Sequence, residues 1–294
     1  MSVRKFMIAL VIVCLSGSIS YGAETTPAGL SWRPVAGDKK NCKLIADYRL
    51  TQVQAGVATE LAFQFGFGIG FEVLEVDPAG NSLIKVVLHS LLMRAGGPGG
   101  TMIDFDSTAP WQVTNGANLV LAALPGLTYT VRLDPAGQAG EVKGLQEALR
   151  LIDQKLPNIP EKKSLLNNLQ GRLQYQSLLG LAANPGLYPS QPVTVGSEWN
   201  GTADLLYNDL HFKTNDQFRL VALDSAMAVV NVASVMNPVL LGTEQFRGEQ
   251  RGTVRLDAVS GWPVALEQAQ ELTAVGAAGN RITMKGTLTL APLN

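Results

Sequence analysis

Residues that could act as nucleophiles, metal ligands or proton carriers are few in this chain. Its two histidines, His89 and His211, lie far apart in sequence, and neither stands in a zinc motif such as His-Glu-x-x-His. The chain also has no Gly-x-Ser-x-Gly segment, which would place a nucleophilic serine on a sharp turn. Cys42 could form a thiol dyad with a histidine, but nothing in its neighbours indicates an activated thiolate. We expect Cys42 to be a small buried side chain.

Two carboxylates offer a second kind of chemistry. Asp104 and Asp106 alternate along one predicted strand, so their side chains share a face. Paired carboxylates can hold a metal ion or divide acid and base roles in a hydrolase. Two such acids more often line a solvated face, which is the interpretation that we favour.

The most unusual segment alternates large apolar residues with glycine between residues 63 and 71. In a strand, Phe63, Phe65, Phe67, Ile69 and Phe71 lie on one face, and the glycines at 66, 68 and 70 leave the other face almost without side chains. Glycine weakens a strand, so we expect either a close approach to the bare face or a sharp bend that curves the sheet. The apolar row is then part of the core or a wall of an apolar ligand cavity.

The same glycines do not indicate a nucleotide site. A dinucleotide fingerprint needs its glycines between a strand and a helix N-terminus, where backbone amides meet the pyrophosphate. Here the strand pattern continues from Phe71 to Val76.

The elements that must hold these residues are mainly strands. From residue 42 to about 140, apolar residues alternate with polar ones, and turn-forming residues stand at the breaks. Three strands end in an aspartate followed by a glycine, at Asp77 and Gly80, Asp134 and Gly137, and Asp257 and Gly261. Such an aspartate can accept hydrogen bonds inside its own turn, and the glycine suits positive φ. We expect three hairpins there.

Between residues 141 and 181 the period changes to that of a helix. Apolar residues at spacings of three and four form one stripe before Pro157 and another after Pro160, so we expect two helices in an antiparallel hairpin lying across the sheet. The stripes consist of Val142, Leu145, Leu149, Ile152 and Leu156, and of Leu166, Leu169 and Leu173. Strands return over residues 193–292, where Ile282, Met284, Leu288 and Leu290 share a face.

The first residues read as a secretory signal peptide. Arg4 and Lys5 precede an apolar run that ends at Leu15, and small and polar residues follow. The run is about half of the ~20 residues that a membrane-spanning helix needs. We expect residues 1–22 to be removed by cleavage after Gly22, with a cut after Ala23 as the alternative, and residues 23–294 to form a single β-rich domain.

Several short motifs, taken in order, resemble a family of secreted bacterial proteins classed only as a domain of unknown function. They are Tyr48-x-Leu50, Phe105-Asp106-Ser107, Leu133-Asp134-x-x-Gly137, Pro192-Val-x-Val-Gly196-x-x-Trp199 and Gly261-x-Pro263. That resemblance implies no catalytic residue, cofactor or substrate. At the level of fold, the order of strands and helices is similar to the periplasmic lipoprotein carriers. By that analogy the hairpin is a lid and the phenylalanine row is part of a wall.

These observations predict an α+β fold, in which a large curved antiparallel β sheet or half-barrel is covered by an inserted helical hairpin. A formal net charge of −1 gives no basic surface for nucleic acid. We expect an exported, non-catalytic protein of the periplasm or extracellular space that binds or carries an apolar small molecule or lipid. It would need no cofactor or metal and have no transmembrane helix after processing, and its oligomeric state stays open. The residues expected to line the ligand site are Phe63, Phe65, Phe67, Phe71, Leu145, Leu149, Leu166, Leu169 and Leu173. The alternatives are a hydrolase that uses Asp104 and Asp106, and a structural or assembly partner at the cell surface.

Overall fold

A computed structural model describes most of the chain between residues 29 and 293. The described residues are 29–54, 56–110, 116–158, 162–163, 166–167, 170, 173, 184–207, 210–241, 244–275 and 281–293. The expected signal peptide therefore lies outside the described residues.

The described strands join into one 12-stranded sheet in which every pairing is antiparallel. Its order is β6-β5-β3-β2-β1-β12-β11-β10-β9-β8-β7, and β4 also pairs with β3. The strands are β1 (Lys39–Gln54), β2 (Val57–Val76), β3 (Ser82–Gly97), β4 (Gly100–Asp106), β5 (Thr128–Leu133), β6 (Ala139–Lys143), β7 (Glu198–Tyr207), β8 (Leu210–Leu223), β9 (Met227–Leu241), β10 (Glu244–Asp257), β11 (Pro263–Val275) and β12 (Arg281–Pro292). The prediction of a large antiparallel sheet is confirmed.

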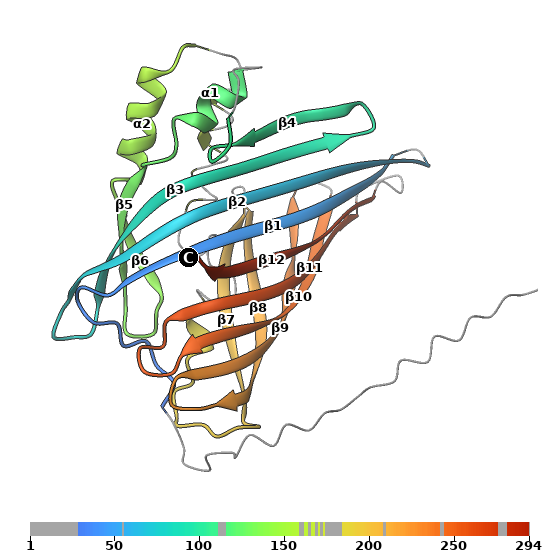
Figure 1. The fold of residues 1–294 in the computed structure, drawn as a ribbon. Coiled ribbons are helices and arrows are strands. Elements are labelled where there is room, and N and C mark those ends of the chain that lie inside the picture. Colours follow the sequence, from blue (N-terminus) through green and yellow to red (C-terminus); the bar gives the residue numbers. More distant parts are fainter. Residues whose placement is uncertain are drawn as a thin grey trace, which may run out of the picture.

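The sheet is open and strongly curved. Figure 1 shows β7 and β8 behind β10, β11 and β12, so the sheet has a concave inner face and a convex outer face. The long strand β3 has a different neighbour along each half, because Ser82–Val87 pairs with β5 and Leu92–Gly97 pairs with β4. Among the described strands, the sheet ends in β6 and β4 on one side and in β7 on the other.

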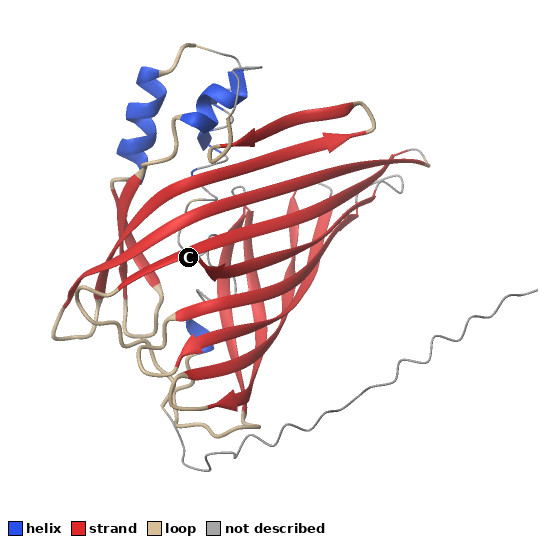
Figure 2. Ribbon diagram, viewed as in Figure 1, coloured by secondary structure: helices blue, strands red, loops and turns tan. Residues whose placement is uncertain are grey.

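Two α-helices of the described residues lie at one end of the sheet, beside β4 and β5 (Figure 2). They are α1 (Gly116–Ala122), where the sequence pattern predicted strands, and α2 (Leu145–Lys155); Pro185–Leu187 forms a single 3-10 turn. α2 matches the first expected helix, but the second falls on residues that are mostly outside the described part, so the expected hairpin is not confirmed. Among the described residues no helix is both long enough and apolar enough to cross a membrane.

The start of α2 differs from the expectation at Val142. This residue belongs to β6 and pairs with Val131 of β5, because Gly144 takes a φ of 87° and separates the strand from the helix. Helical spacing alone could not show that break, since a valine also suits a strand. Leu145 and Leu149 form the buried face of α2 as expected.

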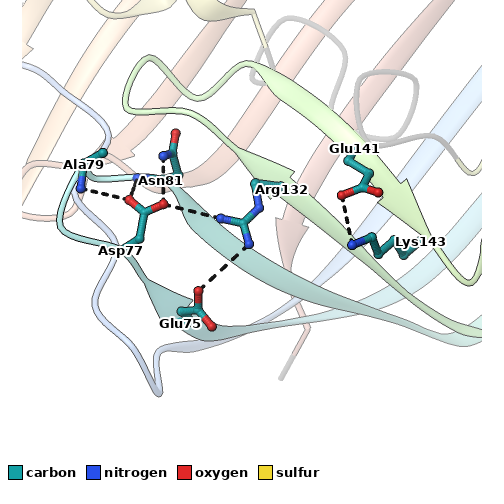
Figure 3. A network of polar contacts seen from close by, with 7 residues as sticks. All are labelled: Glu75, Asp77, Ala79, Asn81, Arg132, Glu141 and Lys143. Atoms are coloured by element: carbon teal, nitrogen blue, oxygen red, sulfur yellow. Dashed lines mark hydrogen bonds and ion pairs between the residues drawn. The ribbon is translucent and has the colours of Figure 1, made fainter.

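The three expected aspartate turns are confirmed. In the first, Asp77 Oδ1 accepts hydrogen bonds from the backbone N–H groups of Ala79 and Asn81, and Gly80 has a φ of 84° (Figure 3). Arg132 on β5 contacts both Asp77 and Glu75, at 3.4 and 3.9 Å. Asp134 and Asp257 accept equivalent backbone bonds in their own turns. These bonds hold the pKa of Asp257 below its usual value, first through the N–H of Ser260.

The glycines at 66, 68 and 70 of β2 make room for side chains of the neighbouring strand β3. Side chains of β3 occupy the space over the glycines, with Leu92 at 3.0 Å from where a Cβ of Gly66 would lie and His89 against Gly70. The register also shifts between Gly68 and Ile69, where β3 carries an extra residue. Of the two expectations from the sequence, the close approach is therefore present, and the register shift is a feature that the sequence did not predict.

One end of the concave face is filled by aromatic packing. Trp32, from the segment before β1, lies 4.7 Å from Trp262 between ring centroids, and Trp262 meets Phe71 edge to face at 5.8 Å. The indole N–H of Trp32 donates to Ser82 Oγ at 3.0 Å inside this core. The segment before β1 thus fills the interior of the sheet at the end where the aspartate turns lie.

Candidate functional site

A groove of about 940 Å³ opens on the sheet. This volume falls in the range of small-molecule sites. Its lining comes from six neighbouring strands and β4, and the central lining residue on each is Ile103, Ala95, Phe63, Tyr48, Gly286, Gln270 or Gln250. The other lining residues are mostly their immediate neighbours along each strand. The groove therefore crosses the strands at one level of the sheet.

These central residues belong to one line of paired positions, which we call the cross-strand row. From β4 to β7 each member pairs with the next through the sheet register: Ile103, Ala95, Phe63, Tyr48, Gly286, Gln270, Gln250, Ser234, Asp216 and Gly201. Tyr48 and Gln250 are buried while the residues on either side of them in their strands are exposed, and Ala95 is buried between the exposed Arg94 and the partly buried Gly96. Because side chains alternate along a strand, the row faces the inside of the curved sheet.

The row changes character along its length. Its members on β2, β3 and β4 are the apolar Phe63, Ala95 and Ile103. From β1 onward it carries hydroxyl, amide and carboxyl groups, at Tyr48, Gln270, Gln250, Ser234 and Asp216. The groove consequently has one apolar wall and one wall able to form hydrogen bonds.

Three side chains on the polar wall and one buried residue beside them form a connected hydrogen-bond network, the glutamine cluster of Tyr48, Gln250, Gln270 and the buried Gln268. The Tyr48 hydroxyl donates to Gln270 Oε1 at 2.7 Å, and Gln270 Nε2 donates to Gln250 Oε1 at 3.1 Å. Gln268 Nε2 also donates to Gln250 Oε1. Gln250 and Gln268 are only 2% and 3% exposed. Buried amides of this kind must be hydrogen-bonded to be tolerated, which explains why they bond to one another.

The network leaves hydrogen-bonding capacity unused. Gln268 Oε1 is buried without a partner, and Gln250 Nε2 makes no side-chain hydrogen bond within the described residues. Further along the row, Ser234 Oγ and Asp216 Oδ1 are also buried without partners in the described part of the chain. Buried polar atoms without partners are rare, so this concentration marks the inner face as unusual.

Asp216 is tied to the loop before β7. Its Oδ2 accepts hydrogen bonds from Asn184 Nδ2 at 2.6 Å and from Thr214 Oγ1 at 3.0 Å, and Asn184 Oδ1 accepts from the N–H of Gly186. Gly201, the row's last member, leaves the space that Gly186 occupies. These contacts anchor residues 184–187 against β7 and β8.

The charges around the groove balance. Its lining contains four basic residues, Arg49, Arg94, Arg251 and Lys285, and four acidic residues, Asp47, Asp104, Glu249 and Glu271. Three of the acids pair with bases on the exposed side, with N to O distances of 3.1 Å for Arg94 and Asp104, 3.7 Å for Arg251 and Glu249, and 2.9 Å for Lys285 and Glu271. The groove as a whole therefore presents no net charge to a ligand.

The residues expected to line a ligand site are placed in three settings. Phe63 lines the groove, and the other three phenylalanines are buried in the core. Leu145, Leu149, Leu166 and Leu173 belong to the same core cluster, and Leu149 and Leu166 also line a separate hollow of about 470 Å³ beside α2. Leu169 lies outside the described residues. The Tyr129 hydroxyl on β5 donates to the carbonyl of Leu173, which anchors that residue to the sheet.

The other chemical candidates have local partners or are inaccessible. Burial raises the pKa of Cys42 to about 12, so its thiol is protonated at neutral pH. Asp104 pairs with Arg94, whereas Asp106 accepts bonds from the side chain and backbone of Thr108, which lower its pKa. The described residues contain no group of three histidine, cysteine or acidic side chains that could hold a metal ion.

Sequence reasoning missed the glutamine cluster. A signal was present in β11, where Glu267, Ala269 and Glu271 alternate with Leu266, Gln268 and Gln270. Charged residues on one parity indicate the outer face, which assigns the glutamines to the inside. Nothing in the sequence, however, shows that Tyr48, more than 200 positions away in the chain, reaches the same cluster.

Comparison with solved structures finds similarities at very low sequence identity. A structure of lipovitellin, described by its lipid–protein interactions, matches with a TM-score of 0.51 and 7% identity, over 88% of this chain and 25% of that one. This chain therefore spans about a quarter of the lipovitellin chain. An outer membrane channel from Pseudomonas putida F1 and a lipoprotein-sorting protein domain from Vibrio parahaemolyticus have TM-scores of 0.24 and 0.15, each with 8% identity. They cover 92% and 83% of this chain, and 100% and 83% of their own.

Sequence comparison places the chain in a family. No curated protein matches it. Residues 79–263 match the model of a family of unknown function, DUF6263, in agreement with the resemblance seen in the motifs. This match extends from the turn after β2 to the first residue of β11 and covers more than half of the sequence. The chain therefore belongs to the DUF6263 family.

Proposed function

We propose that this protein is an exported, non-catalytic carrier that binds an apolar or lipid-like ligand in the groove. The observation that carries the proposal is the groove itself, which leaves about 940 Å³ open on the inner face of a sheet whose other end is filled by Trp32 and Trp262. A sheet that only needed a core would close on its own side chains throughout.

The apolar wall supports the choice of ligand. Phe63, Ala95 and Ile103 lie side by side on three strands, and their side chains are paired across the sheet. Burying apolar ligand surface against such a wall is favourable, at about 25 cal/mol per Å². Lipovitellin shares the fold and is described by its lipid–protein interactions, which is an analogy in the same direction.

Export rests on the sequence pattern of residues 1–22, and we place the mature protein in the periplasm or extracellular space on that basis. The phenylalanines at 65, 67 and 71 and Leu145 and Leu149 of α2 belong to the buried core, and they do not line the groove.

Binding of Nile red, an uncharged fluorophore that brightens in apolar surroundings, tests the proposal. Ala95→Trp would fill the groove from β3, and Arg255→Trp adds the same side chain at an exposed position of β10 as the control. We expect saturable binding to the wild type and to Arg255→Trp, and binding weaker by at least about tenfold to Ala95→Trp. If Ala95→Trp is misfolded by circular dichroism, Ile103→Trp replaces it. Absence of saturable binding to the wild type, or equal binding to the blocked variant, contradicts the proposal.

A further inference from the structure

The two walls of the groove differ in chemistry, and this difference narrows the class of ligand beyond the statement that the ligand is apolar. The members of the cross-strand row that line the groove are apolar on β2, β3 and β4, and carry hydroxyl or amide groups on β1, β10 and β11. A wholly apolar ligand would cover the groove-lining amides without offering them a hydrogen-bond partner, which costs free energy. A ligand with a polar end could lie with that end on the polar wall.

We infer that the groove takes an amphiphile whose head group is uncharged and forms hydrogen bonds through hydroxyl or amide groups. This inference rests on the proposed function, because it names the class of ligand for the same groove. The head would lie on Tyr48, Gln250 and Gln270, and the tail would lie along Phe63, Ala95 and Ile103.

The glutamine cluster supplies the hydrogen bonds. Gln250 lines the groove, and its Oε1 accepts hydrogen bonds from both Gln268 and Gln270. Its amide nitrogen has no side-chain partner in the described part of the chain. Gln268 Oε1 is a buried acceptor without a partner in the described residues, although Gln268 itself does not line the groove. An amide side chain can donate through its nitrogen and accept through its oxygen. A hydroxyl or amide head, which also donates and accepts, matches such a wall.

The charge distribution disfavours an ionised head. Every groove-lining member of the glutamine cluster is uncharged, and the basic and acidic residues around the groove are equal in number. Three of the four acids are already paired with bases. A carboxylate, phosphate or ammonium head would lose its hydration on entering the groove. Only the exposed Arg49 and Asp47 would offer it an opposite charge that is not already in an ion pair.

Ser234 and Asp216 extend the same preference. They continue the polar part of the row beyond Gln250, and each has a buried oxygen without a partner in the described residues. Ser234 and Asp216 lie beyond the lining of the groove, so they extend the polar character of the row without contacting the head group directly.

Displacement of bound Nile red by ligands of equal chain length tests the inference. The competitors are monolaurin, lauric acid, dodecylamine and dodecane, all below their aggregation thresholds. On the wild type we expect monolaurin, whose head carries uncharged hydroxyls, to displace the probe at concentrations at least about tenfold lower than the other three. In the variant Tyr48→Phe/Gln250→Leu/Gln268→Leu/Gln270→Leu, which removes the glutamine cluster, this advantage should disappear and dodecane should compete as well as monolaurin.

The outcomes separate the inference from the proposed function. If all four competitors displace the probe equally from the wild type, or an ionised head is preferred, the inference is wrong while the carrier proposal stands. If the wild type binds neither probe nor competitor, the carrier proposal itself fails. If the cluster variant does not fold, the order in which the four competitors displace the probe from the wild type still tests the inference.

Discussion

The ring of Tyr48 lies over Gly286 on the neighbouring strand, and its hydroxyl reaches beyond that strand to donate a 2.7 Å hydrogen bond to Gln270. A Cβ on residue 286 would clash with the Tyr48 ring and with the backbone oxygen of Asp47. The absence of a side chain at one position of β12 thus connects β1 to β11 through a side-chain bond. This contact begins the polar wall of the groove.

Gly286→Ala should therefore destabilise the protein. The backbone oxygen of Asp47 cannot move away as a flexible side chain could, so we expect a loss of at least about 2 kcal/mol in the free energy of unfolding. Denaturant unfolding followed by circular dichroism measures it. Gly140→Ala on β6 is the matched control, because its Cβ would meet only Arg132 O at an ordinary 3.6 Å. Equal effects of the two substitutions would show that Tyr48 does not lie over Gly286.

The glutamine cluster should show strong coupling between its members. Gln250→Leu leaves the amides of Gln268 and Gln270 without their acceptor, which should cost about 1–3 kcal/mol of stability. Adding Gln268→Leu removes one of those stranded amides, so the double variant should lose less stability than the sum of the two single variants. A double-mutant cycle from denaturant unfolding provides the measurement. Additive effects would mean that the two glutamines do not contact each other.

The turn at Asp257 predicts a pH dependence of stability. Hydrogen bonds, first from the N–H of Ser260, lower the pKa of Asp257 in the folded state below its usual 3.8. The ionised carboxylate therefore stabilises the fold above pH 3.8, and this contribution is lost as the pH falls through the lowered folded value. Asp257→Ala should reduce stability by about 1 kcal/mol at neutral pH. The difference from the wild type should shrink in acid, and a difference that stays constant down to pH 2 would refute this role.

Cys42 should resist thiol reagents in the folded protein. Burial raises its pKa to about 12, so almost no thiolate forms at neutral pH and the reagent has little access. Because the folded value lies above the usual 9.0, this group stabilises the fold below pH 9.0 and the contribution is lost as the pH rises toward about 12. Labelling with a chromogenic disulfide reagent, with and without denaturant, checks accessibility. Rapid labelling of the native protein at neutral pH would be incompatible with a buried thiol.

How much the sequence predicted depends on whether a feature is local. The turns at Asp77, Asp134 and Asp257 were predicted correctly because an aspartate and a glycine a few residues apart suffice to form them. The close approach to Gly66 and Gly70 was also expected, although the residues that make it, Leu92 and His89, were not. Alternation identified the strands, but it left open which face of each was the inner one.

Features that depend on distant pairing escaped prediction. The cross-strand row exists only because β1 pairs with β12, which places the two ends of the described chain side by side. No local pattern contains that register, so Tyr48, Gln250 and Gln270 could not be grouped beforehand. For the same reason Phe65, Phe67 and Phe71, which looked equivalent to Phe63, turn out to lie deeper in the core while Phe63 alone of the four lines the groove.

Native mass spectrometry of protein purified from cells without denaturation tests the central claim most directly, because it detects a ligand in the groove without assuming which one. The wild type and Arg255→Trp should carry a small amphiphile with an uncharged head, released on unfolding and identifiable by its mass, and Ala95→Trp should carry much less of it. A wild-type protein free of any ligand that also takes up no Nile red would contradict the account. A ligand retained equally by Ala95→Trp would show that it binds elsewhere.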